Sequence, residues 1–474
     1  MTDAATRPAE RPAEQPAARP AEQPAARAPW AARARAWVDA RPAWQRWALV
    51  MLGLGLLSTV LVLRFSYGHP ALSRADEYVY VDAVDKAMHG ELTRQGAQID
   101  EYAMELIACQ GIELFGTQGE TCGGPYDVET FPYRGGITSA DIHSPVYYFT
   151  TAALTKAVQV LTPVDDLLMA ARLTGALWLA LGLTALIGLA RELGASRTSS
   201  GLVALLVLTA PSVRWTNAYI TPDALNLLAG SLIAIAALRY VRGRWSPWVL
   251  VGISAVAAAV KAQNSIGSAL AALFLVIFAA TVAEGRTWGR FWRFLGVGAG
   301  GVAAALAVQV GYNLLRSAWA LSPAPPMDTS EPLRVTAALG QAKVFMLQVV
   351  LGPDSTFAPA LEHVRPGVLP TLTAWLLAAG LIAAALFVTT LDDVQSRFAR
   401  ATALAFIAAG PLFYVLIYVM TDRTFGLPDR YGQVMLPAMA ASAALLVRAR
   451  WVQWLLLAMA AGGYVTALVT LRLA

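Results

Sequence analysis

The stretch WALVMLGLGLLSTVLVLRFSYGHPALSRADE, residues 47–77, places an apolar segment directly before two neighbouring carboxylates. Residues 47–63 carry no charged side chain and come close to the roughly 20 residues that cross the hydrocarbon core of a bilayer. Asp76 and Glu77, which follow, are costly to hold beside an apolar phase unless they are paired or perform a chemical task. The stretch therefore predicts a membrane protein with its chemistry just beyond the first span.

The rest of the chain repeats the apolar pattern. Of its 474 residues 57% are hydrophobic and only 14% are charged, whereas soluble domains carry about 25% charged residues. Ten further segments have nearly the length of a span: 167–190, 201–218, 224–238, 246–260, 266–282, 294–314, 370–390, 401–420, 433–447 and 451–471. We expect an all-α polytopic membrane protein with about eleven transmembrane helices.

Basic residues decide the topology. The net charge of +5 could indicate nucleic-acid binding, but Lys and Arg cluster at the ends of apolar segments, which is typical of cytoplasmic loops. Those clusters share the side of the N-terminus only if segment 146–162 does not cross the bilayer. This segment contains Lys156 and Gln159, and we interpret it as an amphipathic helix on the outer surface.

Two regions follow from this topology. Residues 1–45 are rich in Pro, Ala and Arg and predict a disordered cytoplasmic tail with an interfacial anchor. Residues 46–474 form the transmembrane domain, with a helical external loop at 64–166 and a second external loop at 315–369. We expect a multi-pass plasma-membrane protein with a cytoplasmic N-terminus and an extracytoplasmic site.

Both cysteines, Cys109 and Cys122, lie in the first external loop. In an oxidising compartment they would form one disulfide, which contributes about 3 kcal/mol in the chain-entropy model. The alternative is two unrelated free thiols. The absence of any other cysteine from the sequence favours the disulfide.

Four short motifs share the predicted external side. They are Asp76-Glu77, DIHSPVYY at 141–148, NAYITPD at 217–223 and DRYGQVMLP at 429–437. Together, over about residues 46–450, they resemble the GT-C superfamily of glycosyltransferases that use polyprenyl-phosphate sugars. The likeness is to protein mannosyltransferases (family 39) and aminoarabinose transferases, and to related uncharacterised actinobacterial membrane proteins. Ser144 and Asp429 depart from the family patterns, which have proline and glycine there.

The resemblance implies that Asp76 is the catalytic base. An acceptor hydroxyl must lose its proton as it attacks the anomeric carbon, and a carboxylate can take that proton. The family inverts the anomeric centre in one displacement, and Glu77 would orient the acceptor. The alternative is that both carboxylates cap the helix that begins there.

The negative charge that develops on the leaving phosphate must be stabilised by cationic side chains. Arg430 is the first candidate, because a guanidinium binds phosphate through two hydrogen bonds, and Lys261 is the second. The alternative is that both side chains reach towards lipid headgroups at the ends of spans. Tyr147 and Tyr431, which lie in the quoted motifs, are further candidates for substrate binding.

The roles of two further candidate residues stay open. Asp223 would bind the acceptor, the sugar or a metal shared with Asp76, or else would cap the next helix behind Pro222. His143 would contact phosphate or sugar, although a lone loop histidine is more often structural.

No Cys/His spacing typical of zinc and no Walker motif occurs, so nucleotide sugars and ATP are not expected as direct donors. We predict no cofactor; a divalent metal could be accommodated, but no sequence feature indicates one.

These observations predict transfer of a sugar from polyprenyl phosphate to an acceptor hydroxyl of a glycan, lipid or protein. A transporter or flippase of a lipid-linked substrate is the main alternative, and a non-catalytic assembly subunit is another. The predicted gathering of charges at one face argues against a transporter, whose charges tend to lie near the bilayer midplane.

Overall fold

The computed structural model describes residues 37, 40–74, 76–281, 288–323, 332–352, 367–387 and 392–469. Its contacts separate residues 1–49 from residues 50–474, and every element below belongs to the second unit apart from the start of α2. The predicted tail, 1–45, lies mostly outside the described residues. The described part is helical and has isolated β-bridges but no strand.

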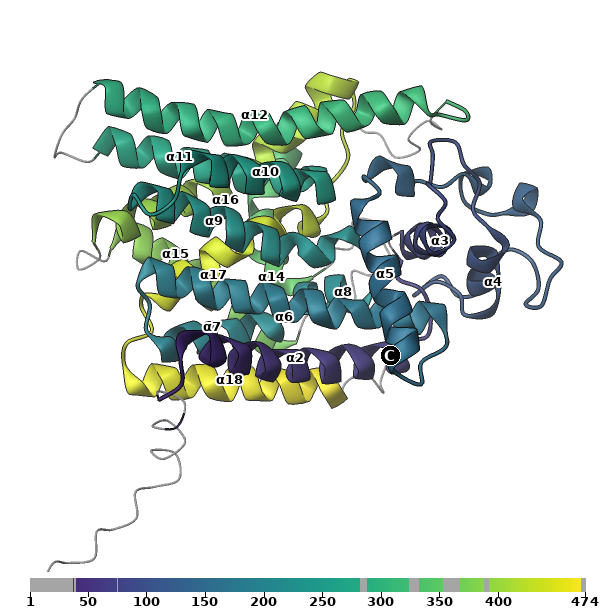
Figure 1. The fold of residues 1–474 in the computed structure, drawn as a ribbon, viewed down its shortest axis with the longest axis horizontal. Coiled ribbons are helices and arrows are strands. Elements are labelled where there is room, and N and C mark those ends of the chain that lie inside the picture. The colour runs from purple at the N-terminus through teal and green to yellow at the C-terminus, as the bar shows by residue number, and fades with distance from the viewer. Residues whose placement is uncertain are drawn as a thin grey trace, which may run out of the picture. The chain divides into compact units, whose positions relative to one another are not determined.

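Most helices run side by side in one bundle (Figure 1). They are α2 (Ala43–Gly68), α6 (Leu167–Leu193), α7 (Arg197–Leu208), α8 (Pro211–Ala218), α9 (Asn226–Val241), α10 (Pro247–Val260), α11 (Ser265–Thr281), α12 (Trp288–Ala318), α15 (Val368–Leu386), α16 (Asp393–Thr421), α17 (Leu436–Ala444) and α18 (Arg450–Val469). Short 3-10 segments join some of them: η4 (Pro222–Leu225), η5 (Ala262–Asn264) and η9 (Asp429–Met435).

Eight helices in the described residues are long and apolar enough to cross a membrane. They match eight of the eleven predicted spans, and the all-α polytopic fold is confirmed. The other three predicted segments are helical but short or broken. Segment 201–218 divides where Pro211 opens α8, because proline lacks the N–H that a continuous helix needs. Segment 246–260 is the 14-residue α10, and segment 433–447 divides into η9 and α17.

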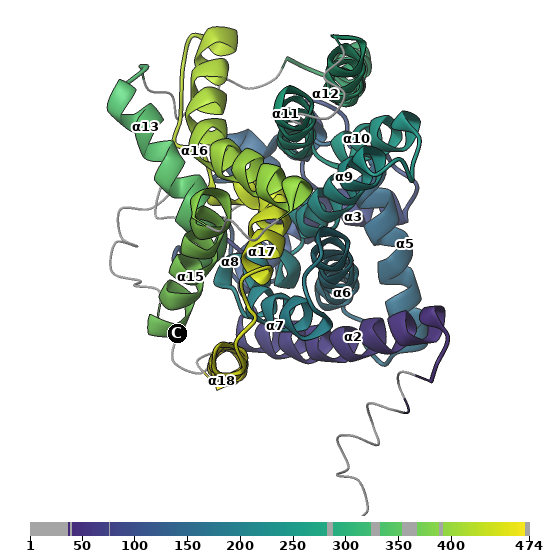
Figure 2. The ribbon, with the colours of Figure 1, turned by 90° about the vertical axis from the view of Figure 1, so that its left-hand side faces the viewer.

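Segment 146–162 forms α5 (Val146–Leu161), a 16-residue helix that is not among the candidate spans. In Figure 1 it runs crosswise to α6, and it packs against α6 and α3, at the edge of the bundle in Figure 2. This length and direction agree with the predicted amphipathic helix that does not cross the bilayer.

The first loop is a folded module with its own apolar core. It contains α3 (Glu77–Met88), α4 (Glu101–Cys109) and the 3-10 turns η1 (Val128–Thr130), η2 (Arg134–Gly136) and η3 (Ala140–Ile142). Its buried cluster includes Val84 and Ile107 and extends to Tyr147 at the start of α5. Cys109 and Cys122 are joined by a disulfide with an S–S distance of 2.00 Å. The module covers the end of the bundle where the predicted motifs lie.

The second loop contains a helix that the sequence analysis did not foresee. α13 (Val335–Lys343), the π-helical segment Val344–Gln348 and α14 (Val349–Leu351) follow one another and pack against α16 and η9. A Cβ atom on Gly432 of η9 would approach Val349 to 2.7 Å and the Phe345 ring to 3.1 Å. This unforeseen helix therefore supports the segment that carries Arg430.

The path of η9 also depends on Gly230 in α9, because a Cβ atom there would overlap the carbonyl oxygen of Val434. Gly230→Ala should displace η9 and lower the free energy of unfolding by about 1–3 kcal/mol, the usual cost of overpacking. Gly252→Ala is the control, since a Cβ atom on this helical glycine would meet no atom within 4 Å. Thermal unfolding in detergent should separate the two variants. Equal melting temperatures would show that the close approach of α9 to η9 is not required.

Candidate active site

Four charged side chains, distant in sequence, meet at the covered end of the bundle. Asp76 precedes α3, Asp223 lies in η4, Lys261 ends α10 and Arg430 lies in η9. Arg430 Nη2 donates a hydrogen bond to Asp76 Oδ2 at 3.0 Å, and Arg430 Nε lies 3.6 Å from Asp223 Oδ2. Lys261 Nζ donates to Asp223 Oδ1. The four candidates therefore form one continuous chain of alternating charge.

Asp76 is the carboxylate of this chain that solvent reaches. Its side chain is 40% exposed, whereas that of Asp223 is 0% exposed. The backbone of Asp76 is left-handed, with φ 64°, which is uncommon for a residue other than glycine and recurs at functional sites. Asp76 stands at the N-cap position of α3, but its side chain makes no capping hydrogen bond. The capping alternative thus does not describe this side chain, which is directed to Arg430.

Arg430 keeps donors unused. It is 7% exposed, and its Nε and Nη1 atoms are buried without a hydrogen-bond partner among the described residues. Leaving a buried donor unpaired costs about 1–3 kcal/mol, more for a charged group, so such atoms require an explanation. Asn226 Nδ2 fixes the backbone by donating to the Arg430 carbonyl at 3.0 Å. The guanidinium is therefore held in place, with Nε facing Asp223 and the N–H groups of Nη1 available to an anion.

Asp223 positions the cations and does not cap a helix. Thr221 is the cap, because its hydroxyl accepts from the Asp223 N–H at 3.3 Å. The Asp223 carboxylate takes hydrogen bonds from Lys261, from Asn226 at 2.9 Å and from the Thr221 hydroxyl at 3.0 Å. Lys261 Nζ in turn lies 5.3 Å from the centre of the Tyr431 ring, a cation–π contact. Asn226 was missed because its place beside Asp223 depends on the 3-10 turn of η4.

Glu77 is held inside the protein, and its predicted role of orienting an acceptor stays a prediction. It is fully buried, and Arg172 of α6 binds it through Nε at 2.9 Å and Nη2 at 2.8 Å. The backbone N–H groups of Ser73 and Ile220 donate to the same carboxylate at 2.7 and 3.0 Å. These four hydrogen bonds engage both carboxylate oxygens. Arg172 was missed by the sequence analysis, although a charged residue inside an apolar segment is itself a signal.

Tyr147 joins the first loop to the bundle, and His143 contacts a neighbour within that loop. Tyr147 is 2% exposed, and its hydroxyl accepts from the Thr221 N–H at 3.0 Å, so it braces the turn of Asp223. Its predicted contact with substrate stays a prediction. His143 Nε2 lies 3.4 Å from the hydroxyl of Tyr80. Tyr80 was missed, although it follows Asp76 by one helical turn and therefore shares its face.

His143 should make the fold sensitive to acid. Burial and the neighbouring charge of Lys261 lower its pKa to about 3, so the folded protein keeps this imidazole neutral. In the unfolded chain histidine titrates at about 6.5, so below that pH the unfolded state gains a proton that the folded state refuses. This should remove up to about 1.4 kcal/mol of stability per pH unit as the pH falls from about 6.5 towards 3.

His143→Gln should lack that part of the pH dependence. The melting temperatures of both proteins should be measured in detergent between pH 7.5 and 5. The difference between them should be smaller at pH 5 than at pH 7.5. If the melting temperature changed with pH equally in wild type and variant, a group other than His143 would be responsible for the pH dependence.

Comparisons with known proteins add distant likenesses. No family model matches the chain, and no curated protein matches it. Among solved structures the chain is similar to ArnT from Cupriavidus metallidurans in the apo state, with a TM-score of 0.38 and 16% identity over 91% of this chain and 78% of that one. The same enzyme bound to undecaprenyl phosphate gives a TM-score of 0.37 and 15% identity over 90% and 77%. Likenesses this distant carry no argument about chemistry, which rests on the geometry above.

Proposed function

We propose that this protein transfers a sugar from a polyprenyl-phosphate donor to an acceptor hydroxyl at the extracytoplasmic face of the plasma membrane. The observation that carries the proposal is the pairing of a solvent-reached carboxylate, Asp76, with a buried guanidinium, Arg430, that keeps N–H groups unused. Sugar transfer from a lipid phosphate needs a base for the acceptor and a cationic site for the leaving group. These two neighbours supply both.

In the proposed reaction the acceptor oxygen attacks the anomeric carbon while its proton passes to the Asp76 carboxylate. The bond between the anomeric carbon and the phosphate oxygen breaks, and its electron pair leaves with polyprenyl phosphate. Arg430 and Lys261 stabilise the charge that develops on that phosphate. One displacement inverts the anomeric centre, and no glycosyl-enzyme forms.

The ion pairs among the four charged residues are compatible with this reaction. A donor phosphate that binds Arg430 through both Nη1 and Nη2 would compete with Asp76 for Nη2, which would release the carboxylate to act as a base. The Asp223 carboxylate already accepts hydrogen bonds from Lys261, Asn226 and Thr221, so we assign it the role of holding the cations in place. In this proposal the cationic role belongs to Arg430 and Lys261.

The position of the charges favours a transferase over a transporter. Lys261 ends α10, and the first loop touches that end of α10 because the Ser144 hydroxyl donates to the carbonyl of Ala259. The site thus lies where the bundle meets the folded loop, whereas transporters bind their substrates near the midplane of the bundle. A non-catalytic subunit would have no need for an accessible carboxylate beside a buried cation, so this pair also argues against that alternative.

Lipids that accumulate in a deletion strain test the proposal. Mass spectrometry should find a polyprenyl-phosphate sugar that rises on deletion and returns to its normal level with the wild-type gene. Asp76→Asn should fail to restore that level, whereas Asp165→Asn, the same exchange at an exposed loop position, should restore it. Accumulation of no such lipid, or restoration by Asp76→Asn, would contradict the proposed reaction.

Arg430→Ala should weaken donor binding. It removes charge-assisted hydrogen bonds worth about 1.5–3 kcal/mol, so the Kd for undecaprenyl phosphate should rise roughly 10- to 150-fold. Arg430→Lys should restore only part of the affinity, because lysine keeps the charge and loses the planar fork. Arg244→Ala is the control, since this arginine is 63% exposed. Unchanged affinity in Arg430→Ala would remove Arg430 from the phosphate site.

A further inference from the structure

Arg214 of α8 is a half-buried cation that pairs with no described residue. It belongs to the predicted apolar segment 201–218, where a charged side chain is rare and costly. Its Nε atom is buried without a hydrogen-bond partner, and no ion pair among the described residues includes Arg214. A charge in such a segment normally pairs with another group or marks the path of a substrate or ligand. Arg214 therefore requires an explanation of its own.

Arg214 faces the end of α2. Its guanidinium carbon lies 5.7 Å from the centre of the Phe65 ring, and the His69 ring stacks on Phe65 with 4.3 Å between the ring centres. Arg64, which precedes Phe65, donates from Nε to the carbonyl of Leu468 in α18 at 3.1 Å. Burial lowers the pKa of His69, and the positive charges of Arg214 and Arg64 lower it further. Arg64, His69 and Arg214 therefore form one basic cluster.

The carboxylates near this basic cluster serve other cations. Arg172 binds the Glu77 carboxylate at 2.8 Å. Burial raises the pKa of Glu113, and the charge of Arg74 opposes that rise. No ion pair among the described residues joins a carboxylate to the basic cluster. The basic cluster therefore keeps a positive charge that the described part of the protein does not neutralise.

The basic cluster lies at an edge of the bundle that faces lipid. α18 runs along α2 at the lower edge of Figure 1, where the Tyr464 hydroxyl donates to the carbonyl of Leu57 at 2.8 Å. Val60 and Tyr67 share a helical face with Arg64 and are 40% and 66% exposed. Exposed apolar side chains on a membrane span contact lipid. Arg64 lies one helical turn before the end of α2, which is the level of lipid headgroups.

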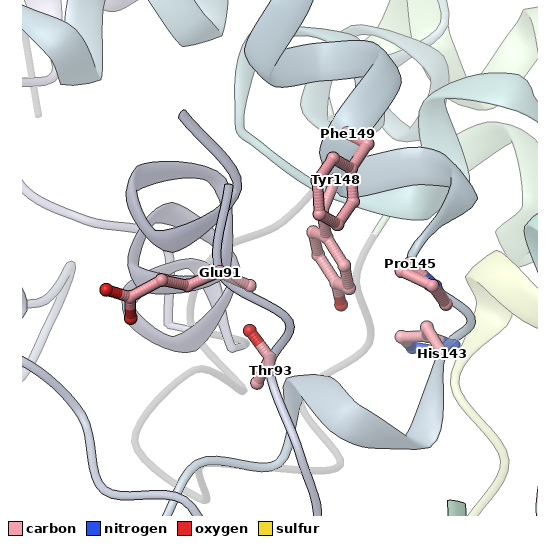
Figure 3. A pocket seen from close by; sticks show the side chains of 7 residues that line it. Glu91, Thr93, His143, Pro145, Tyr148 and Phe149 are labelled. Carbon is pink, nitrogen blue, oxygen red and sulfur yellow. The ribbon is translucent and has the colours of Figure 1, made fainter. Parts of the chain in front are cut away.

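Three aromatic rings separate the basic cluster from Arg430. Phe65, Trp215 and Tyr219 form a small apolar core of their own. Trp215 lies on the side of Arg430, with 5.9 Å between its ring centre and the guanidinium carbon, and Phe65 lies on the side of His69. The hollow beside α3 that Figure 3 shows is lined by other residues. The basic cluster is therefore distinct from both features.

We propose that the basic cluster binds the phosphate group of a membrane lipid, at a site separate from that of Arg430. The Arg214 guanidinium supplies a planar fork that matches two phosphate oxygens, and Arg64 adds a second positive charge on the side that faces lipid. A headgroup reaches this site from the bilayer and needs no enclosed pocket. The phosphate is that of a phospholipid or of a polyprenyl phosphate. The inference holds whether or not the protein transfers sugar.

Melting temperatures of the full chain, delipidated in uncharged detergent, test the inference. The probes are phosphatidylglycerol, undecaprenyl phosphate, phosphatidylcholine and inorganic phosphate. Phosphatidylglycerol or undecaprenyl phosphate should raise the melting temperature, because a ligand that binds the folded state alone stabilises it. Phosphatidylcholine, whose choline group offsets the phosphate charge, and inorganic phosphate, which has no lipid tail, should raise it less. Arg430→Ala, which alters the candidate donor site, should keep the response.

Arg214→Gln should raise the apparent Kd of the responding lipid at least about tenfold, because charge-assisted hydrogen bonds to the phosphate are lost. Arg214→Lys should keep part of the affinity, since lysine retains the charge and loses the fork. Without lipid, Arg214→Gln should melt close to wild type, because the exchange gives up no hydrogen bond or ion pair with a described residue. Arg334→Gln is the matched control, since Arg334 is exposed in front of α13.

The probe that gives the response identifies the source of the phosphate, and either lipid supports the inference. No response to either lipid, or an equal response to inorganic phosphate, would overturn it. So would an equal change of Kd in Arg334→Gln, or a melting temperature of lipid-free Arg214→Gln far below that of wild type, because Arg214 would then serve the fold. A response that is lost in Arg430→Ala and kept in Arg214→Gln would place the lipid at the candidate active site and also overturn the inference.

Discussion

Asp76→Asn is expected to lower kcat by roughly 10²- to 10⁴-fold, the range for loss of a general base, with little change in donor affinity. The exchange preserves almost everything except the basic group. Asparagine tolerates the left-handed backbone that Asp76 adopts, and its side-chain oxygen can still accept from Arg430 Nη2. Its amide cannot take a proton from the acceptor.

Purified wild type and variant should therefore bind undecaprenyl phosphate with similar Kd while differing in turnover. Asp76→Gly adds a second check, because glycine keeps the backbone conformation and removes the side chain. A kcat near that of wild type in both variants would show that another group removes the proton.

Arg172→Met is expected to lower the free energy of unfolding by about 3–5 kcal/mol, the cost of leaving a buried charge without its partner. The variant leaves the Glu77 carboxylate, which is 0% exposed, without its charged partner. Among the described residues the carboxylate then keeps two hydrogen bonds, both from backbone N–H groups. Arg172 also donates to the carbonyls of His69 and Ala71 at 2.8 Å each, so the chain before α3 loses its anchor. Denaturation in detergent should register the loss.

Glu77→Gln combined with Arg172→Met should be less harmful than the sum of the two single changes, because the double variant buries no uncompensated charge. Arg244→Ala serves as the control, since this exposed pairing with Glu192 should contribute no more than about 1 kcal/mol. If Arg172→Met were as mild as the control, the pair would not be the anchor described here.

The sequence indicated four residues that the structure brings together, but it did not indicate which of them pair. Asp76, Asp223 and Arg430 were singled out by motifs that resemble those of a known superfamily, and Lys261 by its charge at the external end of an otherwise apolar segment. Their mutual pairing was not predicted, because it depends on contacts such as Arg430 with Asp76 across 354 positions.

Two adjacent residues can also differ completely in burial. The left-handed turn at Asp76 leaves its side chain partly exposed, while Glu77 enters the core against Arg172. Periodicity alone cannot reveal such a turn. The predicted bounds 246–260 match α10 within one residue. Segment 433–447 divides instead, because the 3-10 turn η9 occupies its start and apolar composition does not record where such a turn ends.

Sealed proteoliposomes that contain the purified protein, a polyprenyl-phosphate sugar labelled in its sugar, and an acceptor give the most direct test of the central claim. The protein should move the label from lipid to acceptor and release one polyprenyl phosphate for each sugar transferred. Movement of the intact labelled lipid across the bilayer, with its sugar–phosphate bond unbroken, would show a carrier and contradict the account.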